Sequence, residues 1–283
     1  MVFYSFIINT NMGMSFVTEI SAKINTALAV TGRDEKGFHL IDTIMRRFPL
    51  YDKVRASERA DDEVNVVYSD GRRYERDNAL RAALTIKEKF ALPGFDVYIE
   101  KGIPAGAGIG GSSADAAGVA RCLKEIFGID YDCGFLLTLG ADVPFQYSGW
   151  DAARVRGKGE SLEPLDAEEI YVTLACGNTV SDTASVFTAF DLTGGIGGDV
   201  EKYLRDGIPF NELETAAVML EPGILDARKA LSEAGFGMIT MTGSGSGYIG
   251  LTSDIEENER LYRAAQVSAA KRGLKIFNSV IKP

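Results

Sequence analysis

The residues best suited to chemistry gather in a glycine-rich stretch near the middle of the chain. Residues 104–117 read PAGAGIGGSSADAA, with a predicted strand before them and a predicted helix after them. Four glycines let the backbone approach a ligand closely and adopt positive φ: Gly106, Gly108, Gly110 and Gly111. A helix start presents free N–H groups and a positive dipole end to an anion, and Ser112 and Ser113 add hydroxyls that can reach phosphate or a magnesium ion. The stretch therefore predicts a phosphate-binding loop, although a glycine-rich turn that only caps a helix is the plainer alternative.

The same stretch also satisfies the dinucleotide-binding pattern G-x-G-x-x-G. That pattern requires an acidic residue at the end of a second strand about 20 residues further on. Asp130 and Asp132 lie at that distance, but they directly follow the predicted helix rather than a strand. An oxidoreductase linked to NAD(P) is therefore the less favoured hypothesis.

Three further segments carry polar groups at positions where the backbone changes direction. Lys23, in Ala22–Asn25, lies at a break between two predicted strands, and by itself it looks like a surface residue. Asp142, in Gly140–Phe145, precedes a proline that restricts the backbone; alone, it is equally well explained as a solvated turn residue. Residues 241–247 read MTGSGSG between two apolar strands, and the amides of such a loop favour a second anion site.

The residues that are missing exclude several kinds of chemistry. His39 is the only histidine, so a multi-histidine metal site is impossible, and no Walker loop occurs. The three cysteines have no C-x-x-C spacing, which is typical of a reducing compartment. A net charge of −10 repels a phosphate backbone, so we expect no nucleic-acid partner. Carboxylates, lysines, hydroxyls and backbone amides remain as the groups that can act.

The chain begins with an apolar run, residues 2–8, that is too short to span a bilayer. No basic residue precedes it and no small-residue cleavage site clearly follows, so a signal peptide is not favoured. We expect residues 1–15 to be a loose extension, with Met14 as an alternative start of translation. We also expect a cytoplasmic protein with no membrane partner, either a monomer or a weak homodimer.

Apolar and polar residues alternate or recur in patterns that predict a mixed α/β chain. Strands are expected on both sides of a polar interruption in 19–31, and at 64–68, 96–100, 171–176, 238–251 and 275–280. Helices are expected at 78–90 with Asn78 as cap, at 112–127 with Ser112 and Asp115 as a start signal, and at 181–190, 210–220, 224–234 and 255–272. The glycine run 194–198 is expected to be a flexible surface loop.

The four polar segments occur together and in an order that resembles the GHMP kinases, the superfamily of galactose, homoserine, mevalonate and phosphomevalonate kinases. Residues 104–114 match its P-x-x-x-G-[LI]-G-x-S-S type of loop. Within the superfamily the resemblance is to the kinases of a cytidine diphosphate-linked methylerythritol, which serve non-mevalonate isoprenoid precursor biosynthesis. It spans about residues 19–251, and the stretches that carry it are 22–25, 37–39, 110–117, 140–145, 157–160, 210–214 and 241–247.

This resemblance implies an ATP-dependent kinase that phosphorylates the 2-hydroxyl of its acceptor alcohol with the help of Mg²⁺. Lys23 and Asp142 would form the catalytic pair, with Asp142 accepting the proton of the hydroxyl and Lys23 keeping Asp142 ionised. Ser113 would be a metal ligand. The ATP phosphates would be held by Pro104, Ala105, Gly106, Ala107, Gly108, Ile109, Gly110, Gly111, Ser112, Ser113 and Ala114. The substrate would be bound by Asn25, Phe38, His39, Ser181, Thr183, Gly243, Ser244 and Gly245, with Phe38 and His39 at the cytosine.

The resemblance also implies an α+β fold with two domains, residues 1–160 and 161–283. The N-terminal domain would bind ATP and resemble ribosomal protein S5 domain 2, the C-terminal domain would be ferredoxin-like, and a cleft would lie between them. A kinase of this superfamily that acts on a mevalonate-like or homoserine-like alcohol is the main alternative. A catalytically inactive binding module of the same fold is a further one, which the presence of Lys23, Asp142 and the intact loop disfavours.

Overall fold

A computed structural model describes residues 6–10, 13–71, 77–166, 168–177, 179 and 181–281. Its contacts divide the chain into two compact units, each assembled from separate segments. The first unit consists of Met1–Ala22, Leu50–Pro104 and Gly110–Gly149. The second consists of Lys23–Pro49, Ala105–Ile109 and Trp150–Pro283. The glycine-rich stretch therefore contributes to both units, and the domain boundary near residue 160 stays a prediction.

The first unit contains a sheet whose strands run in the order β1-β2-β3-β5-β4, with β4 parallel to β5 and antiparallel pairs at β1–β2 and β3–β5. The strands are β1 Phe6–Thr10, β2 Gly13–Arg33, β3 His39–Glu58, β4 Val64–Tyr68 and β5 Phe95–Glu100, of which β2 and β3 also contribute residues to the second unit. The helices are α1 Asn78–Phe90, α2 Gly111–Phe127, α3 Cys133–Leu139 and α4 Val143–Ser148.

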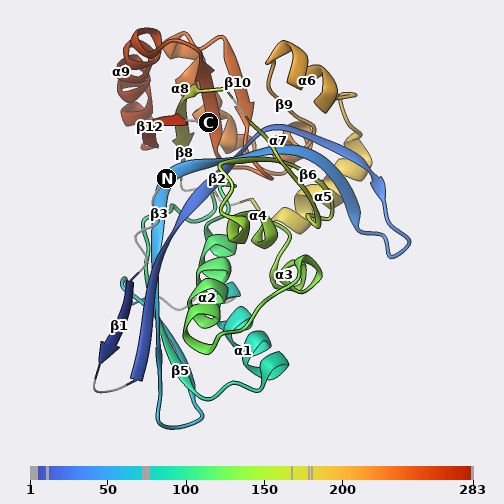
Figure 1. The fold of residues 1–283 in the computed structure, drawn as a ribbon. Coiled ribbons are helices and arrows are strands. Elements are labelled where there is room, and N and C mark those ends of the chain that lie inside the picture. The colour runs from blue at the N-terminus through green and yellow to red at the C-terminus, as the bar shows by residue number, and fades with distance from the viewer. Residues whose placement is uncertain are drawn as a thin grey trace. The chain divides into compact units, whose positions relative to one another are not determined.

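Helices α1 and α2 pack side by side and share one hydrophobic core with the strands of the first unit (Figure 1). Small residues on α2 allow this close packing, because Ala116, Ala117 and Ala120 are all fully buried. Gly118, on the same helix, has no room for a side chain. A Cβ there would lie 2.5 Å from a methyl group of Val54 on β3.

The second unit contains a four-stranded antiparallel sheet in the order β10-β11-β8-β12. Its strands are β8 Ile170–Cys176, β10 Met238–Met241, β11 Tyr248–Thr252 and β12 Lys275–Ile281, and α8 Leu225–Ala234 and α9 Ile255–Lys271 contact this sheet and each other. The remainder of β2 and β3 pairs with β9 and β6, and β6 pairs with β7. The other elements are β6 Ala152–Gly157, β7 Ser161–Pro164, α5 Thr183–Thr193, α6 Val200–Asp206, β9 Phe210–Asn211, α7 Glu214–Leu220 and η1 Pro222–Ile224.

The predicted α+β class is confirmed, but several local predictions are wrong. Residues 6–10 form a strand paired with β2, whereas we expected residues 1–15 to be a loose extension; residues 1–5 and 11–12 lie outside the described part. The interruption predicted within 19–31 is absent from the continuous strand β2. Residues 210–211 are a short strand rather than the start of a helix, because they pair with Ala27 and Leu28.

Two predicted helix caps are also wrong. Asp77, rather than Asn78, accepts the capping hydrogen bond from the N–H of Leu80 in α1. Helix α2 begins at Gly111 after a left-handed Gly110, and no side chain caps it. Ser112 and Asp115 therefore do not form the predicted start signal. Among the described residues, no helix is long and apolar enough to cross a membrane.

The contact at Gly118 generates a stability prediction. Gly118→Ala should lower the free energy of unfolding by about 1–3 kcal/mol, because overpacking against Val54 outweighs the gain in helix propensity of roughly 1 kcal/mol. Chemical denaturation of the variant and the parent protein measures this difference.

Val54→Ala supplies the matched control, since it removes the methyl groups that Gly118→Ala would strike. In that background Gly118→Ala should cost less than in the parent protein, although the Cβ of residue 54 still lies 2.9 Å from the added methyl group. Additive effects of the two substitutions would show that the two sites do not contact each other.

Candidate active site

Residues 105–109, in the second unit, turn sharply at two glycines. Gly106 has φ +75° and Gly108 has φ +69°, and Gly110, just beyond, has φ +75°. These are left-handed conformations that residues with a Cβ adopt only at a cost. The N–H of Lys23 donates to the carbonyl of Ile109 at 2.9 Å, so β2 fixes the end of this segment.

The second predicted loop, residues 241–247, lies directly against the first within the same unit. The N–H of Gly247 donates to the carbonyl of Ala107 at 3.1 Å, and that of Ser246 to Gly106 at 3.2 Å. A Cβ on Gly108 would overlap the carbonyl oxygen of Thr242 and lie 2.7 Å from that of Gly245. The two loops thus meet backbone to backbone, at a distance that only glycine permits.

Two buried asparagines hold the 241–247 loop in place. The Nδ2 of Asn211 donates to the carbonyls of Met241 and Gly243, both at 2.8 Å. The backbone N–H of Asn25 donates to the Oγ1 of Thr242 at 2.9 Å. Reasoning from the sequence gave Asn211 no role, because its partners lie 30 and 32 residues away along the chain.

Lys23 is buried, so the surface position that its sequence context suggested is wrong. Lys23 is only 4% exposed, and its Nζ donates to the Oδ1 of Asn25 at 2.8 Å. The Nδ2 of Asn25 donates in turn to the Oγ1 of Thr43, which donates to the carbonyl of Ala27. A buried ammonium on such a network is held in one orientation, as a catalytic lysine requires.

The other predicted residues of the phosphate loop and Asp142 lie in the first unit. Because no side chain caps α2, the N–H groups of its first turn are left for another acceptor. Ser113 Oγ lies 3.6 Å from the point that a Cβ of Gly140 would occupy. Ser113 therefore borders the segment that carries Asp142, which immediately precedes α4.

Behind the start of α2 lies an ionic cluster that the sequence did not reveal. Lys101 Nζ lies 2.5 Å from Asp52 and 2.6 Å from Asp115, and Asp52 also accepts the N–H groups of Gly102 and Ile103. Burial raises the pKa of Asp115 to about 8, although the ammonium of Lys101 acts in the opposite direction. Asp52 and Lys101 are 49 residues apart, so no local pattern could have paired them. The cluster ties the strand that enters the glycine-rich stretch to the helix that leaves it.

Phe38 and His39 lie at the hairpin between β2 and β3, in the second unit. His39 Nε2 lies 2.8 Å from a carboxylate oxygen of Asp191 on α5, and Arg33 also pairs with Asp191. The His39 ring packs against Phe187 at 4.9 Å between centroids, whereas Phe38 is 61% exposed. The hydrogen bonds from Arg33 and then His39 lower the pKa of Asp191. Asp191 and Phe187 were missed because only tertiary contact joins them to the hairpin.

The remaining predicted substrate residues also come together in the second unit. Thr183 Oγ1 and Ser244 Oγ form a hydrogen bond at 2.8 Å. A Cβ on Gly245 would lie 3.2 Å from Ser181 Oγ, a buried atom for which the described residues supply no hydrogen-bond partner. The start of α5 is thus joined to the glycine loop 241–247.

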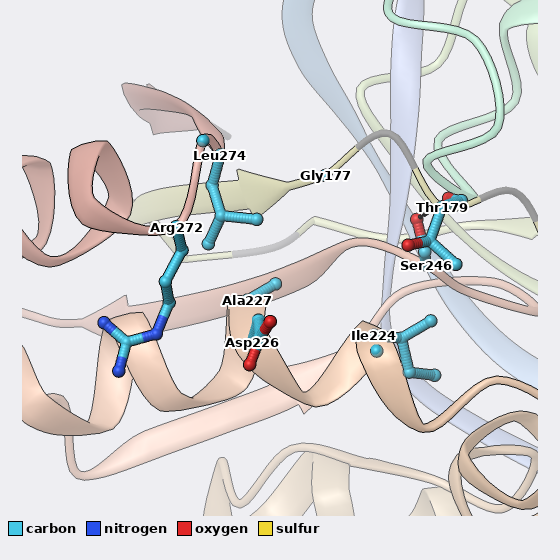
Figure 2. A pocket seen from close by; sticks show the side chains of 10 residues that line it. Gly177, Thr179, Ile224, Asp226, Ala227, Ser246, Arg272 and Leu274 are labelled. Atoms are coloured by element: carbon cyan, nitrogen blue, oxygen red, sulfur yellow. Dashed lines mark hydrogen bonds between the residues drawn. The ribbon is translucent and has the colours of Figure 1, made fainter.

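A pocket of about 200 Å³ borders the 241–247 loop at Ser246 (Figure 2). In Figure 2 Thr179 and Ser246 lie at one end and Arg272 at the other. Ser246 Oγ donates to the carbonyl of Thr179 at 2.5 Å, which links this end to the glycine loop. Ser246 comes from the predicted anion loop 241–247, but none of the residues predicted for catalysis, for ATP or for the acceptor lines the pocket. The lining residues are Gly177, Thr179, Gly223, Ile224, Asp226, Ala227, Ser246, Arg272, Gly273 and Leu274.

Comparison with known proteins shows similarity to the GHMP kinases. Residues 77–153 match the GHMP kinases N terminal domain. Solved structures of the same fold include the homoserine kinase of Cytophaga hutchinsonii, at 18% identity and a TM-score of 0.59 over 93% of this chain and 94% of that one. The mevalonate kinase of L. major matches at 12% identity and a TM-score of 0.66 over 97% of each chain. These two structures share the fold alone.

Proteins of higher sequence identity to this chain share one enzyme name within that superfamily. The 4-diphosphocytidyl-2-C-methyl-D-erythritol kinase of Desulfotalea psychrophila is 30% identical over 90% of this chain and 92% of its own length. The enzyme of the same name from Neisseria meningitidis serogroup A is 31% identical over 86% and 88%. A crystal structure of 4-(cytidine 5'-diphospho)-2C-methyl-D-erythritol kinase matches at 29% identity and a TM-score of 0.75 over 94% and 99%. This chain therefore belongs to the 4-diphosphocytidyl-2-C-methyl-D-erythritol kinase family.

The contact between the two loops predicts that Gly108→Ala is far more damaging than Gly128→Ala. Both glycines are left-handed, at φ +69° and +65°, but the space around Gly128 is open. Gly128→Ala should cost about 1–2 kcal/mol, the price of the backbone conformation alone. Gly108→Ala should lower the free energy of unfolding by more than this, since the loop of residues 105–109 must move away from Thr242 and Gly245. It should also weaken the stabilisation by ATP. Thermal unfolding with and without ATP measures both effects. Equal costs would mean that the two loops do not touch.

The ionic cluster predicts that Lys101→Met lowers the free energy of unfolding by about 3–5 kcal/mol, because it leaves two buried carboxyl groups, Asp52 and Asp115, without their cation. Adding Asp115→Asn to that variant should recover part of the loss. Lys124→Gln, which breaks the exposed pair with Asp130, is the matched control and should cost less than about 1 kcal/mol. A loss from Lys101→Met no larger than that of the control would contradict the cluster's role. Urea titrations of all three variants provide the comparison.

Proposed function

We propose that this chain transfers the γ-phosphoryl group of ATP to the 2-hydroxyl of 4-diphosphocytidyl-2-C-methyl-D-erythritol, a step in non-mevalonate isoprenoid precursor biosynthesis. The similarity to kinases of that name over nearly the whole chain is the observation that carries the proposal. The sequence motifs of the phosphate loop, Lys23 and Asp142 agree with it.

The phosphates of ATP would lie in the loop of residues 104–114, between its glycine amides and the first turn of α2. Two features support this assignment: the left-handed glycines and the absence of a side-chain cap on α2. Backbone N–H groups at a helix start bind anions without any basic side chain, which agrees with a net charge of −10.

The hydroxyl of Ser113 would hold Mg²⁺ beside the phosphates. The residues described by the structure contain no group of three or more His, Cys, Asp or Glu side chains able to hold a metal. A site with so few protein ligands fits magnesium, which keeps several waters and is bound largely through substrate phosphates. When bound, the ion would neutralise the charge of the phosphates.

In the proposed reaction, the substrate hydroxyl attacks the γ-phosphorus in line with the bond to the leaving ADP. Asp142 accepts the hydroxyl proton while the new O–P bond forms and the bond to the ADP oxygen breaks. In this proposal Lys23 would stabilise the charge that develops as the phosphoryl group is transferred. Asn25, which orients Lys23 at 2.8 Å, would also contact the substrate beside the reacting hydroxyl.

Phe38 and His39 would bind the cytosine, Phe38 by stacking and His39 by a hydrogen bond. The exposure of Phe38 supports this role, since a ring left 61% exposed at a hairpin is open to a planar ligand. Further substrate contacts would come from Ser181, Thr183, Gly243, Ser244 and Gly245. The hydrogen bond between Thr183 and Ser244 supports their acting as one group.

Asp142→Asn should lower kcat by about 10²–10⁴ when ATP and 4-diphosphocytidyl-2-C-methyl-D-erythritol are supplied, because the positioned base is lost. ADP release in a coupled assay measures the effect. Glu256→Gln, which alters an exposed carboxylate on α9, is the control and should retain the parent rate. Normal turnover of Asp142→Asn would remove Asp142 from the mechanism.

The alternatives are separated by the same assay and one binding measurement. A panel of alcohols that includes mevalonate and homoserine tests whether another acceptor is preferred. ATP should raise the melting temperature and NADH should not, since a ligand at 100 times its Kd adds about 2.7 kcal/mol. Stabilisation by NADH alone would favour the oxidoreductase.

A further inference from the structure

Asp191 forms a bridge between two residues of the β2–β3 hairpin region. One of its carboxylate oxygens lies 2.8 Å from His39 Nε2, and the other pairs with the guanidinium of Arg33. The side chain of His39 is only 13% exposed, whereas that of Arg33 is 47% exposed. The imidazole is therefore held by Asp191 on the one side and by protein packing on the other.

The aromatic side chains of α5 restrict the His39 ring further. Phe187 lies 4.9 Å from it with the two planes 31° apart, and Phe190 meets it edge-on at 6.3 Å. Both phenylalanines come from the helix that carries Asp191. The ring thus has one fixed plane and one fixed hydrogen bond, which leaves it little rotational freedom.

The bridge also determines which nitrogen carries the proton. A carboxylate accepts hydrogen bonds and cannot donate one, so Nε2 must be the protonated nitrogen. A neutral imidazole protonated at Nε2 has Nδ1 as an acceptor. The described residues provide no hydrogen-bond partner for Nδ1.

We infer that Asp191 is a specificity-determining positioning residue, which fixes His39 so that Nδ1 accepts a hydrogen bond from the exocyclic amine of a cytosine. The inference rests on the proposed function, because it places the base of that substrate at His39. A uracil presents a carbonyl oxygen where cytosine has the amine, and two facing acceptors repel each other. Asp191 would thereby select the base without touching it.

A purely structural role, as a latch between the hairpin and α5, is the competing explanation. If Asp191 only joined the hairpin to α5, its loss would weaken folding, or would weaken the binding of every acceptor alike. Loss of the positioning contact would instead change the ranking of acceptors. Asp191→Ala removes the acceptor for Nε2–H, whereas Asp191→Asn keeps an amide oxygen in the same place, so the second variant should rescue the first.

The first test needs no substrate, because His39 is the only histidine in the chain. Imidazole ¹⁵N–¹H correlation spectra of the untagged protein should show one neutral ring protonated at Nε2, with that proton protected from exchange. Asp191→Asn should retain the protected proton and Asp191→Ala should lose it. A ring protonated at Nδ1 in the parent protein, or an unchanged signal in Asp191→Ala, would overturn the inference.

The second test compares the cytidine-linked acceptor with its uridine-linked analogue by kcat/KM. Asp191→Ala should reduce the preference for cytidine about tenfold or more, mainly through KM for the acceptor, while KM for ATP changes less than twofold. Asp191→Asn should keep most of the preference. Asp206→Ala, an exposed carboxylate at the end of α6, is the matched control and should keep all of it. A preference unchanged in Asp191→Ala would overturn the inference.

The two tests distinguish failure of the inference from failure of the proposed function. If the parent protein does not phosphorylate the cytidine-linked acceptor at all, the proposed function fails, and the claim of base selection fails with it. The spectra would still decide independently whether Asp191 fixes the ring. If turnover is normal but the cytidine preference does not depend on Asp191, the proposed function stands and only this inference fails.

Discussion

The close approach of two backbone segments organises the second unit. Residues 105–109 and 241–247 hydrogen-bond to each other through main-chain groups, and Gly108 faces Thr242 with no space for a side chain. Because the contact is made by the backbone, side-chain chemistry cannot substitute for it. Two predicted substrate residues are joined to the second of these loops by hydrogen bonds, Asn25 to Thr242 and Thr183 to Ser244.

Buried polar networks set the orientation of the groups that would act on a substrate. Lys23 is oriented by Asn25 and Asn25 by Thr43, whereas Lys101 joins the two carboxylates behind the start of α2. These contacts offset part of the cost of burying charges and amides, although Asp115 Oδ1 has no hydrogen-bond partner among the described residues. Glu212 likewise accepts the N–H of Gly198 and that of Val30. The glycine run 194–198 is a surface loop, as expected, and its flexibility stays a prediction.

The division of the chain into two units bears on how the proposed site is built. Lys23 and Asn25 belong to one unit, and Ser113 and Asp142 belong to the other. Residues 104–114 are shared, since residues 105–109 belong to the second unit and residues 110–114 to the first. The chain passes between its two units several times, and the predicted domain boundary at residue 160 stays a prediction. The pairing of Lys23 with Asp142 and the cleft between domains stay predictions.

The sequence by itself determined the features that depend on neighbours in the chain. The helix at 78–90, the helix that ends before Gly128 and the left-handed glycines of the phosphate loop all follow from local periodicity or from the conformational freedom of glycine. Tertiary structure alone decided the rest. Lys23 is buried, Gly110 rather than Ser112 precedes α2, and Asp191 meets His39 across 152 residues, because burial and ion pairing depend on which segments pack together. No local pattern encodes that information, since the free energy of such a contact is gained only once both segments are folded.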